Sequence, residues 1–165
     1  MVFGIAIAAF SAAMIVAGFS DIATRTIPNR LMLIMGIGFV VLAPLAGLGP
    51  SQIALHLLAG SLALMLGFGC FAAGWIGGGD GKLLAVTALW LGPAAMPDYL
   101  VYSALIGGVL SLAVLMVRTV PLPAVLYGYR WTFQLQAQGA SVPYGVALAV
   151  GGVLAMGASP WLGAA

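Results

Sequence analysis

Residues 2–19 read VFGIAIAAFSAAMIVAGF and contain no charged side chain. A helix needs about 20 mostly apolar residues to cross a bilayer, with a range of roughly 17–25, so this stretch can span one. No Lys or Arg precedes it, whereas Arg25 and Arg30 follow it, which is the reverse of a signal peptide. The stretch therefore predicts a retained first membrane helix with its N-terminus outside.

Five more apolar stretches follow the first. They cover Leu31–Gly47, Gln52–Ile76, Leu83–Met96, Tyr99–Val117 and Val142–Ala158. Over the whole chain 64% of residues are hydrophobic and 5% are charged, and a soluble domain cannot hide that much apolar surface from water. We expect a single all-α domain over residues 1–165, a polytopic membrane helix bundle of about six transmembrane helices in a lipid bilayer.

The basic residues agree with this arrangement of spans. With the N-terminus outside, the inner segments are residues 20–30, 77–82 and 118–141, and Lys and Arg favour the cytoplasmic side of membrane proteins. The inner segments hold all five basic residues of the chain: Arg25, Arg30, Lys82, Arg118 and Arg130.

Two of the chain's three acidic residues lie at the ends of apolar stretches. Asp21 ends the first, and Asp80 precedes the fourth within Gly77-Gly78-Gly79-Asp80-Gly81-Lys82. A carboxylate there is unfavourable, by about 2.5–3.5 kcal/mol at a helix centre and less toward the interface. Both fall on the inner side, and two neighbouring carboxyl groups can share a proton and activate water. This is the chemistry of an intramembrane aspartic peptidase.

Each of these features also has a simpler interpretation. The glycines before Asp80 would let the backbone adopt positive φ and let a substrate strand approach, or they would only turn the chain while Asp80 caps a helix. Asp21 would be an interfacial carboxylate facing Arg25, four residues further along the helix. Neither simpler interpretation explains why two of three acids meet at one side.

The chain resembles the type IV prepilin peptidase family, in its small CpaA- or TadV-like form, from residue 11 to about residue 155. The matching residues are Asp21 with Ile27-Pro28-Asn29, then Gly77-Gly78-Gly79-Asp80-Gly81-Lys82, and Pro143-Tyr144-Gly145. The resemblance implies an aspartic endopeptidase of the bacterial inner membrane, which removes the short basic leader of type IV or Flp-type prepilins at the cytoplasmic face. It implies that Asp21 and Asp80 are the catalytic residues. The residues of the family motifs that accompany them are Gly77, Gly79, Gly81, Lys82, Pro28, Asn29, Pro143, Tyr144 and Gly145.

The chain departs from the larger, bifunctional members of that family. Those members also N-methylate the new pilin N-terminus and carry paired Cys-x-x-Cys motifs that bind zinc. Here Cys70 is the only cysteine, so we expect no methyltransferase activity, no metal and no cofactor. The expected partners are a prepilin or pseudopilin helix, the lipid bilayer and the pilus-assembly machinery, and no nucleic acid.

Two other functions are compatible with carboxylates in a membrane protein. Presenilin-like proteases share Gly-x-Gly-Asp, but they are larger and carry a Pro-Ala-Leu motif that this chain lacks. The alternative from another class is a small ion- or proton-coupled transporter that uses the buried carboxylates. A transporter is expected to hold its acids near the bilayer midplane, whereas here they gather at one side.

Overall fold

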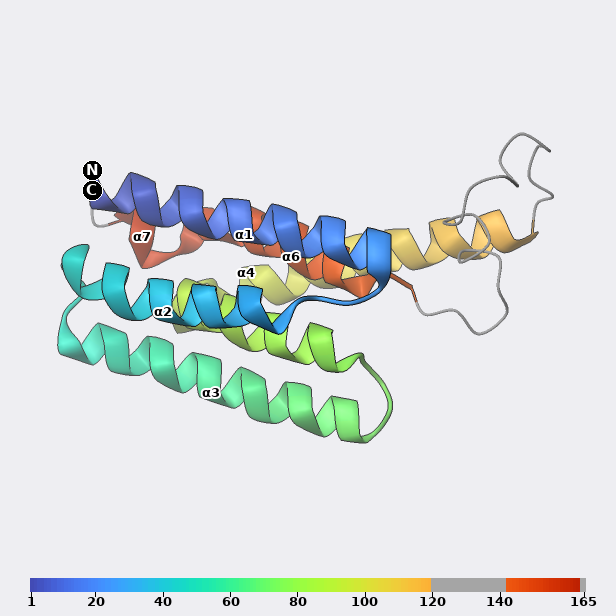
Figure 1. The fold of residues 1–165 in the computed structure, drawn as a ribbon, viewed down its shortest axis with the longest axis horizontal. Helices are drawn as coiled ribbons and strands as arrows, with labels where there is room; N and C mark the ends of the chain where they lie inside the picture. The colour runs from blue at the N-terminus through green and yellow to red at the C-terminus, as the bar shows by residue number, and fades with distance from the viewer. Residues whose placement is uncertain (120–141, 164–165) are drawn as a thin grey trace.

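The computed structural model describes residues 1–119 and 142–163, and all the secondary structure in these ranges is helical. The helices are α1 (Val2–Thr24), α2 (Asn29–Leu45), α3 (Pro50–Ala72), α4 (Gly78–Thr119), α6 (Tyr144–Ala155), the short 3₁₀ helix η2 (Met156–Ala158) and α7 (Pro160–Gly163). The expectation of an all-α fold is confirmed for these residues (Figure 1). Arg130, one of the five basic residues, lies outside the described ranges.

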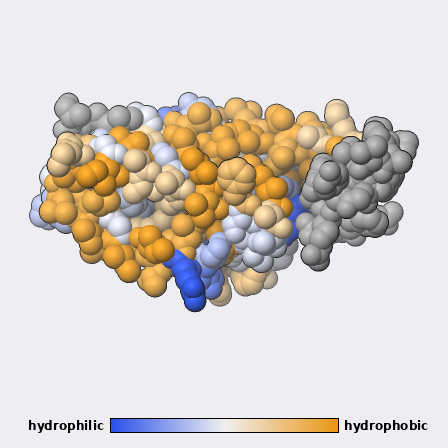
Figure 2. Space-filling model, turned by 45° about the horizontal axis from the view of Figure 1, so that its top comes forward, coloured by the Kyte–Doolittle hydropathy of each residue, from blue (hydrophilic) through white to orange (hydrophobic). Residues whose placement is uncertain are grey.

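The outer surface of the bundle is apolar. Helices α1, α3 and α4 are long and apolar enough to cross a membrane, while α2 and the segment Tyr144–Ala158 are shorter apolar helices. Large hydrophobic side chains point outward, among them Phe19 at 71% exposed and Phe68 at 69% exposed. Figure 2 shows one face covered mostly by such residues. A surface of this kind suits lipid rather than water, so the chain is a membrane protein.

Helix α4 is broken at Gly92 and contains both the fourth and the fifth predicted spans. Gly92 has φ 70° and ψ 175°, which glycine adopts without strain, and the following Pro93 has no N–H to continue the helical hydrogen bonds. In Figure 1 the lime and yellow parts of α4 run in opposite directions, so the chain reverses here. The predicted fourth span, Leu83–Met96, crosses this break, and its end is thereby corrected from Met96 to Gly92.

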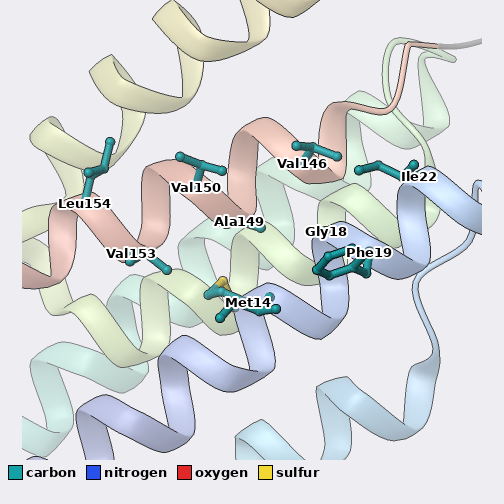
Figure 3. Close-up of a pocket in the computed structure, with 10 residues that line it drawn as sticks. Met14, Gly18, Phe19, Ile22, Val146, Ala149, Val150, Val153 and Leu154 are labelled. Atoms are coloured by element: carbon teal, nitrogen blue, oxygen red, sulfur yellow. The ribbon is translucent and has the colours of Figure 1, made fainter.

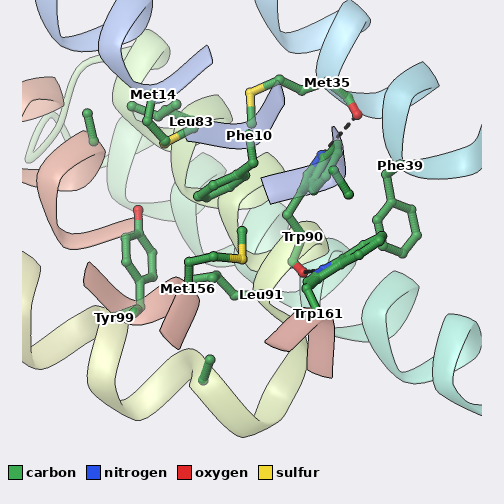
Figure 4. Packing of buried hydrophobic residues seen from close by; sticks show 14 of the residues in the cluster. Phe10, Met14, Met35, Phe39, Leu83, Trp90, Leu91, Tyr99, Met156 and Trp161 are labelled. Atoms are coloured by element: carbon green, nitrogen blue, oxygen red, sulfur yellow. Dashed lines mark hydrogen bonds between the residues drawn. The ribbon is translucent and has the colours of Figure 1, made fainter. Parts of the chain in front are cut away.

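Buried side chains replace the backbone hydrogen bonds lost at the break. The Leu89 carbonyl would pair with the N–H of residue 93, which proline lacks, and instead accepts a hydrogen bond of 2.8 Å from Nδ1–H of His56. The Trp90 carbonyl accepts one of 2.6 Å from the indole N–H of Trp161. The Trp90 and Trp161 rings stack with centroids 5.3 Å apart (Figure 4). Because a membrane interior offers no water to unpaired backbone groups, these bonds stabilise the reversal.

The first turn of α4 lies against α3 at a pair of glycines. A Cβ on Gly67 of α3 would lie 2.9 Å from the backbone of Gly81. Small residues allow helices in membranes to approach this closely, and a side chain at either position would separate them. The contact therefore lets the first turn of α4 pack directly against α3.

The glycine-rich segment 77–82 is mostly helical rather than the inner loop that the sequence predicts, because α4 already begins at Gly78. Positive φ among the described glycines is confined to Gly47, Gly74 and Gly92. The prediction that the glycines before Asp80 serve to allow positive φ is therefore wrong. The close contact with α3 gives a reason for Gly81, the glycine that follows Asp80.

One end of the bundle, on the right in Figure 1, is called here the site end. It holds the ends of α1, α3 and α4 and the starts of α2, α4 and α6. The start of the chain, the α2–α3 connection and α7 lie at the opposite end. The two predicted aspartates, at the end of α1 and the start of α4, therefore lie at the same end of the molecule.

Candidate active site

A polar cavity of about 320 Å³ lies at the site end. It forms where the end of α1, the chain before α2, the first turn of α4 and the residue ahead of Pro143 come together. Its lining consists of Asp21, Arg25, Thr26, Ile27, Asn29, Gly77, Gly78, Gly79, Asp80, Lys82 and Val142. The structure thus brings both predicted aspartates into one cavity.

Asp21 lies in the last turn of α1 and caps a different helix. It is 6% exposed, and its carboxyl accepts hydrogen bonds from the backbone N–H groups of Gly145 and Val146. These groups belong to the first turn of α6, where backbone N–H groups have no partner within their own helix. The side chain of Pro143, at the cap position of α6, accepts no hydrogen bond, so the Asp21 carboxyl takes the place of a capping side chain. The negative charge of Asp21 also interacts favourably with the positive end of the α6 dipole.

Gly145 leaves the space that the Asp21 carboxyl occupies. A Cβ at position 145 would lie 2.8 Å from Oδ2 of Asp21 and 3.0 Å from Cδ1 of Ile27. Oδ2 itself is buried and has no hydrogen-bond partner among the described residues. One oxygen of this carboxyl is therefore not used by the capping interaction.

Asp80 is the third residue of α4 and points back toward the start of its own helix. Its carboxyl accepts a hydrogen bond from the backbone N–H of Gly77, the residue before α4. The third residue of a helix makes the same bond in a capping box. Asp80 is also close enough to Asp21 for the two carboxyl groups to interact electrostatically.

The other predicted residues at the cavity connect α2 to α4. Lys82 Nζ donates a hydrogen bond of 2.9 Å to Oδ1 of Asn29, the first residue of α2. Pro28 is the residue before that helix, in an extended conformation with ψ 131°. The Ile-Pro-Asn segment thereby starts α2 beside the first turn of α4.

Tyr144 and Gly81 lie outside the cavity lining and act by packing. Tyr144 begins α6, and its ring lies so close to Gly107 that any side chain at 107 would overlap it. Gly81 contacts Gly67 of α3, as described above. These two residues hold α6 and α4 in place around the cavity.

Several lining residues were missed as site residues by sequence reasoning. Ile27 is buried, and both Gly79 and Gly145 lie against it, so it is in contact with the segments that carry both aspartates. Its place before Pro28-Asn29 was the available signal. Arg25, Thr26, Gly78 and Val142 also line the cavity. The sequence indicates Arg25 only as a partner of Asp21, and Gly78 only as part of the glycine-rich motif. In the described ranges, no three His, Cys, Asp or Glu residues gather to hold a metal ion.

The fold and the cavity together define a helical membrane protein with a pair of carboxyl groups at one end of the bundle. The sequence matches the model of the type IV leader peptidase family over residues 8–112, more than half of its length. The chain belongs to this family and is a peptidase, which confirms the family resemblance. The matched region holds Asp21 and Asp80 and ends before α6. Searches of curated proteins and of solved structures found no significant match.

Proposed function

We propose that this protein is an intramembrane aspartic endopeptidase that removes the leader of Flp-type prepilins, with Asp21 and Asp80 as the catalytic pair. One observation carries the proposal: two of the chain's three acidic residues line a single polar cavity in an otherwise apolar bundle. Membership of the family indicates a peptidase, and the two carboxyl groups are able to catalyse the hydrolysis of a peptide bond.

The chemistry needs one carboxyl group that is ionised and one that is protonated. Two carboxyl groups in one site share a proton because two negative charges side by side are unfavourable. The ionised group takes a proton from water as the water oxygen bonds to the scissile carbonyl carbon, and the protonated group donates to the carbonyl oxygen. As the C–N bond breaks, the amine takes the proton that came from water, and the other carboxyl recovers its own.

The contacts of both aspartates suit this role. Backbone N–H groups at two helix starts orient the carboxyls, and Oδ2 of Asp21 has no described hydrogen-bond partner. Preorganised groups of this kind need little rearrangement during the reaction. The same contacts would also serve if the aspartates only capped helices, so the decisive experiment must separate capping from catalysis.

The proposal includes the topology expected from the sequence. The chain would make six passes with its N-terminus outside, in the bacterial inner membrane, as a single domain whose cavity faces the cytoplasm. In support, the two parts of α4 count as two passes, and Arg25, Arg30 and Lys82 lie at the site end, where positive charge favours the cytoplasmic side. Methyltransferase activity and a metal form no part of this function.

The test compares cleavage of a Flp-type prepilin by the purified wild type, Asp21→Asn and Asp80→Asn in detergent. Asparagine caps helices about as well as aspartate but cannot exchange a proton. We expect both variants to stay folded, by thermal unfolding, and to lose activity by about 10³-fold or more. Asp98→Asn is the matched control, since Asp98 lines neither the cavity nor the start of α4 or α6.

Substantial cleavage by either folded variant would contradict the catalytic role of the aspartates and would mean that they only cap helices. Absence of cleavage by the wild type would instead favour the transport alternative, and proton flux into vesicles that contain the protein would then be measured.

A further inference from the structure

A second cavity, also of about 320 Å³, lies on the side of the bundle between α1 and α6. Its lining is apolar throughout and consists of Met14, Ile15, Gly18, Phe19 and Ile22 of α1 with Val146, Ala149, Val150, Val153 and Leu154 of α6. Figure 3 shows these residues along both helices, with Val153 and Met14 pointing toward one another. We call this cavity the α1–α6 groove.

Small residues bring α1 and α6 close together at the groove. A Cβ on Gly18 would lie 3.5 Å from Cβ of Ala149, so the two helices cross closely there. Larger side chains on both sides are exposed, including Phe19 at 71% and Leu154 at 53%. From Met14 to Ile22, α1 rises about 12 Å, so the groove has the length of about two helical turns.

One end of the groove lies next to the candidate active site. Ile22 lines it and follows Asp21 in α1, while Val146 lines it and donates a backbone hydrogen bond to the Asp21 carboxyl. An extended segment that joins a helix in this groove would therefore emerge beside Asp21. The apolar groove and the polar cavity are therefore neighbours along α1.

We propose that the α1–α6 groove binds the apolar transmembrane helix of the substrate and places the peptide bond ahead of that helix at Asp21 and Asp80. This inference rests on the proposed function, whose substrate consists of a leader followed by an apolar helix. A lipid chain would also find the groove apolar. The place of the groove favours a helix, because its end lies next to the Asp21 carboxyl, where the peptide bond ahead of that helix has to lie.

Cross-linking tests the occupant directly. A photoreactive benzophenone residue replaces Val153 in the Asp80→Asn variant, and the matched control places it at Val41 of α2, which is also apolar and half-exposed. With a Flp-type prepilin as the probe in native-like bilayers, we expect a covalent adduct from position 153 that unlabelled prepilin competes away, and none from position 41. Adducts to lipid alone at position 153, or equal adducts at both positions, would overturn the proposal.

Enzyme kinetics give the second test. Val153→Trp fills the groove, and we expect kcat/KM for the full prepilin to fall about tenfold, mainly through KM, which corresponds to about 1.4 kcal/mol of binding. Val41→Trp is the control and should stay within about twofold of wild type. A shorter peptide that ends before the apolar helix should be cleaved equally well by both variants. A similar loss for the short peptide, or no loss for the prepilin, contradicts docking in the groove.

The outcomes separate this inference from the proposed function. Cleavage by the wild type without an adduct at position 153 would agree with the peptidase proposal and contradict binding of the substrate helix in the groove. An adduct at position 153 with no cleavage by the wild type would agree with helix binding in the groove and contradict the peptidase proposal.

Discussion

At the scale of single residues, the two aspartates are held by the same physical device. Each carboxyl accepts backbone hydrogen bonds at a helix start, Asp21 at α6 and Asp80 at α4. Helix N-termini bind anions because their first N–H groups are unpaired and the dipole is positive there. The folding of two helices and the positioning of the reactive groups thus depend on the same contacts.

Gly145→Ala tests how accurately Asp21 must be placed. The added methyl would lie 2.8 Å from Oδ2 of Asp21, so the carboxyl has to move. A displacement of about 1 Å at a reacting group can lower the rate by about 100-fold, and we expect a loss of that order in prepilin cleavage. Gly108→Ala is the control, because nothing lies within 4 Å of its Cβ. Wild-type rates for Gly145→Ala would show that cleavage does not depend on this position of the carboxyl.

The sequence predicts the aspartates but not what holds them. Their scarcity in an apolar chain and their common side of the membrane single out Asp21 and Asp80. The cap that Asp21 makes on α6 joins residues far apart in the chain, and no local spacing encodes such a contact. Only the resemblance in Pro143-Tyr144-Gly145 pointed to that segment.

At the scale of helices, the reversal of α4 depends on side chains that complete its backbone. His56→Ala removes the donor to the Leu89 carbonyl, and an unsatisfied buried carbonyl costs about 1–3 kcal/mol. We expect a lower midpoint of thermal unfolding in detergent for His56→Ala and little change for the half-exposed neighbour Leu55→Ala. Cleavage well below that midpoint should persist, because His56 is not among the residues lining the cavity. Unchanged unfolding would mean that the carbonyl finds another partner.

The glycine pair between α3 and α4 should be equally sensitive. Gly67→Ala would place a methyl 2.9 Å from the Gly81 backbone, which must push the first turn of α4, and Asp80 with it, away from α3. Overpacking of this kind costs about 1–3 kcal/mol, and we expect prepilin cleavage to fall at least about tenfold. Gly69→Ala, two residues further along α3, meets nothing within 4 Å and serves as the control. Equal stability and activity for the two variants would contradict this account of the glycine contact.

Sequence patterns predict these helices better than their ends. Long apolar runs indicate that helices exist, but α4 turns at Gly92 although Pro93 and Pro97 both follow within a few residues. The position of the break depends on hydrogen bonds from His56 and Trp161, which belong to other helices. Likewise, the glycine-rich sequence at the start of α4 predicts a loop, whereas in the structure this segment is mostly helical and packs against α3.

At the scale of the whole molecule, the described charges are unevenly distributed between the two ends. Arg25, Arg30, Lys82 and Arg118 lie near helix ends at the site end, together with both cavity aspartates, whereas Asp98 lies a few residues after the break in α4. Because Lys and Arg favour the cytoplasmic side, the distribution predicts that the cavity opens to the cytoplasm. A leader that has not crossed the membrane would be accessible only from that side.

Cysteine labelling in intact cells tests this orientation. In a Cys70→Ala background, Ser51→Cys marks the start of α3 and Ala73→Cys marks the residue after its end, and both positions are exposed. We expect a membrane-impermeant maleimide to label Ser51→Cys in intact cells and Ala73→Cys only after the membrane is opened. Retained prepilin cleavage in both variants would verify that the labelled proteins are folded. The reverse labelling pattern would place the cavity outside, where a leader on the cytoplasmic side could not reach it, and labelling of both positions from one side would mean that α3 does not cross the bilayer.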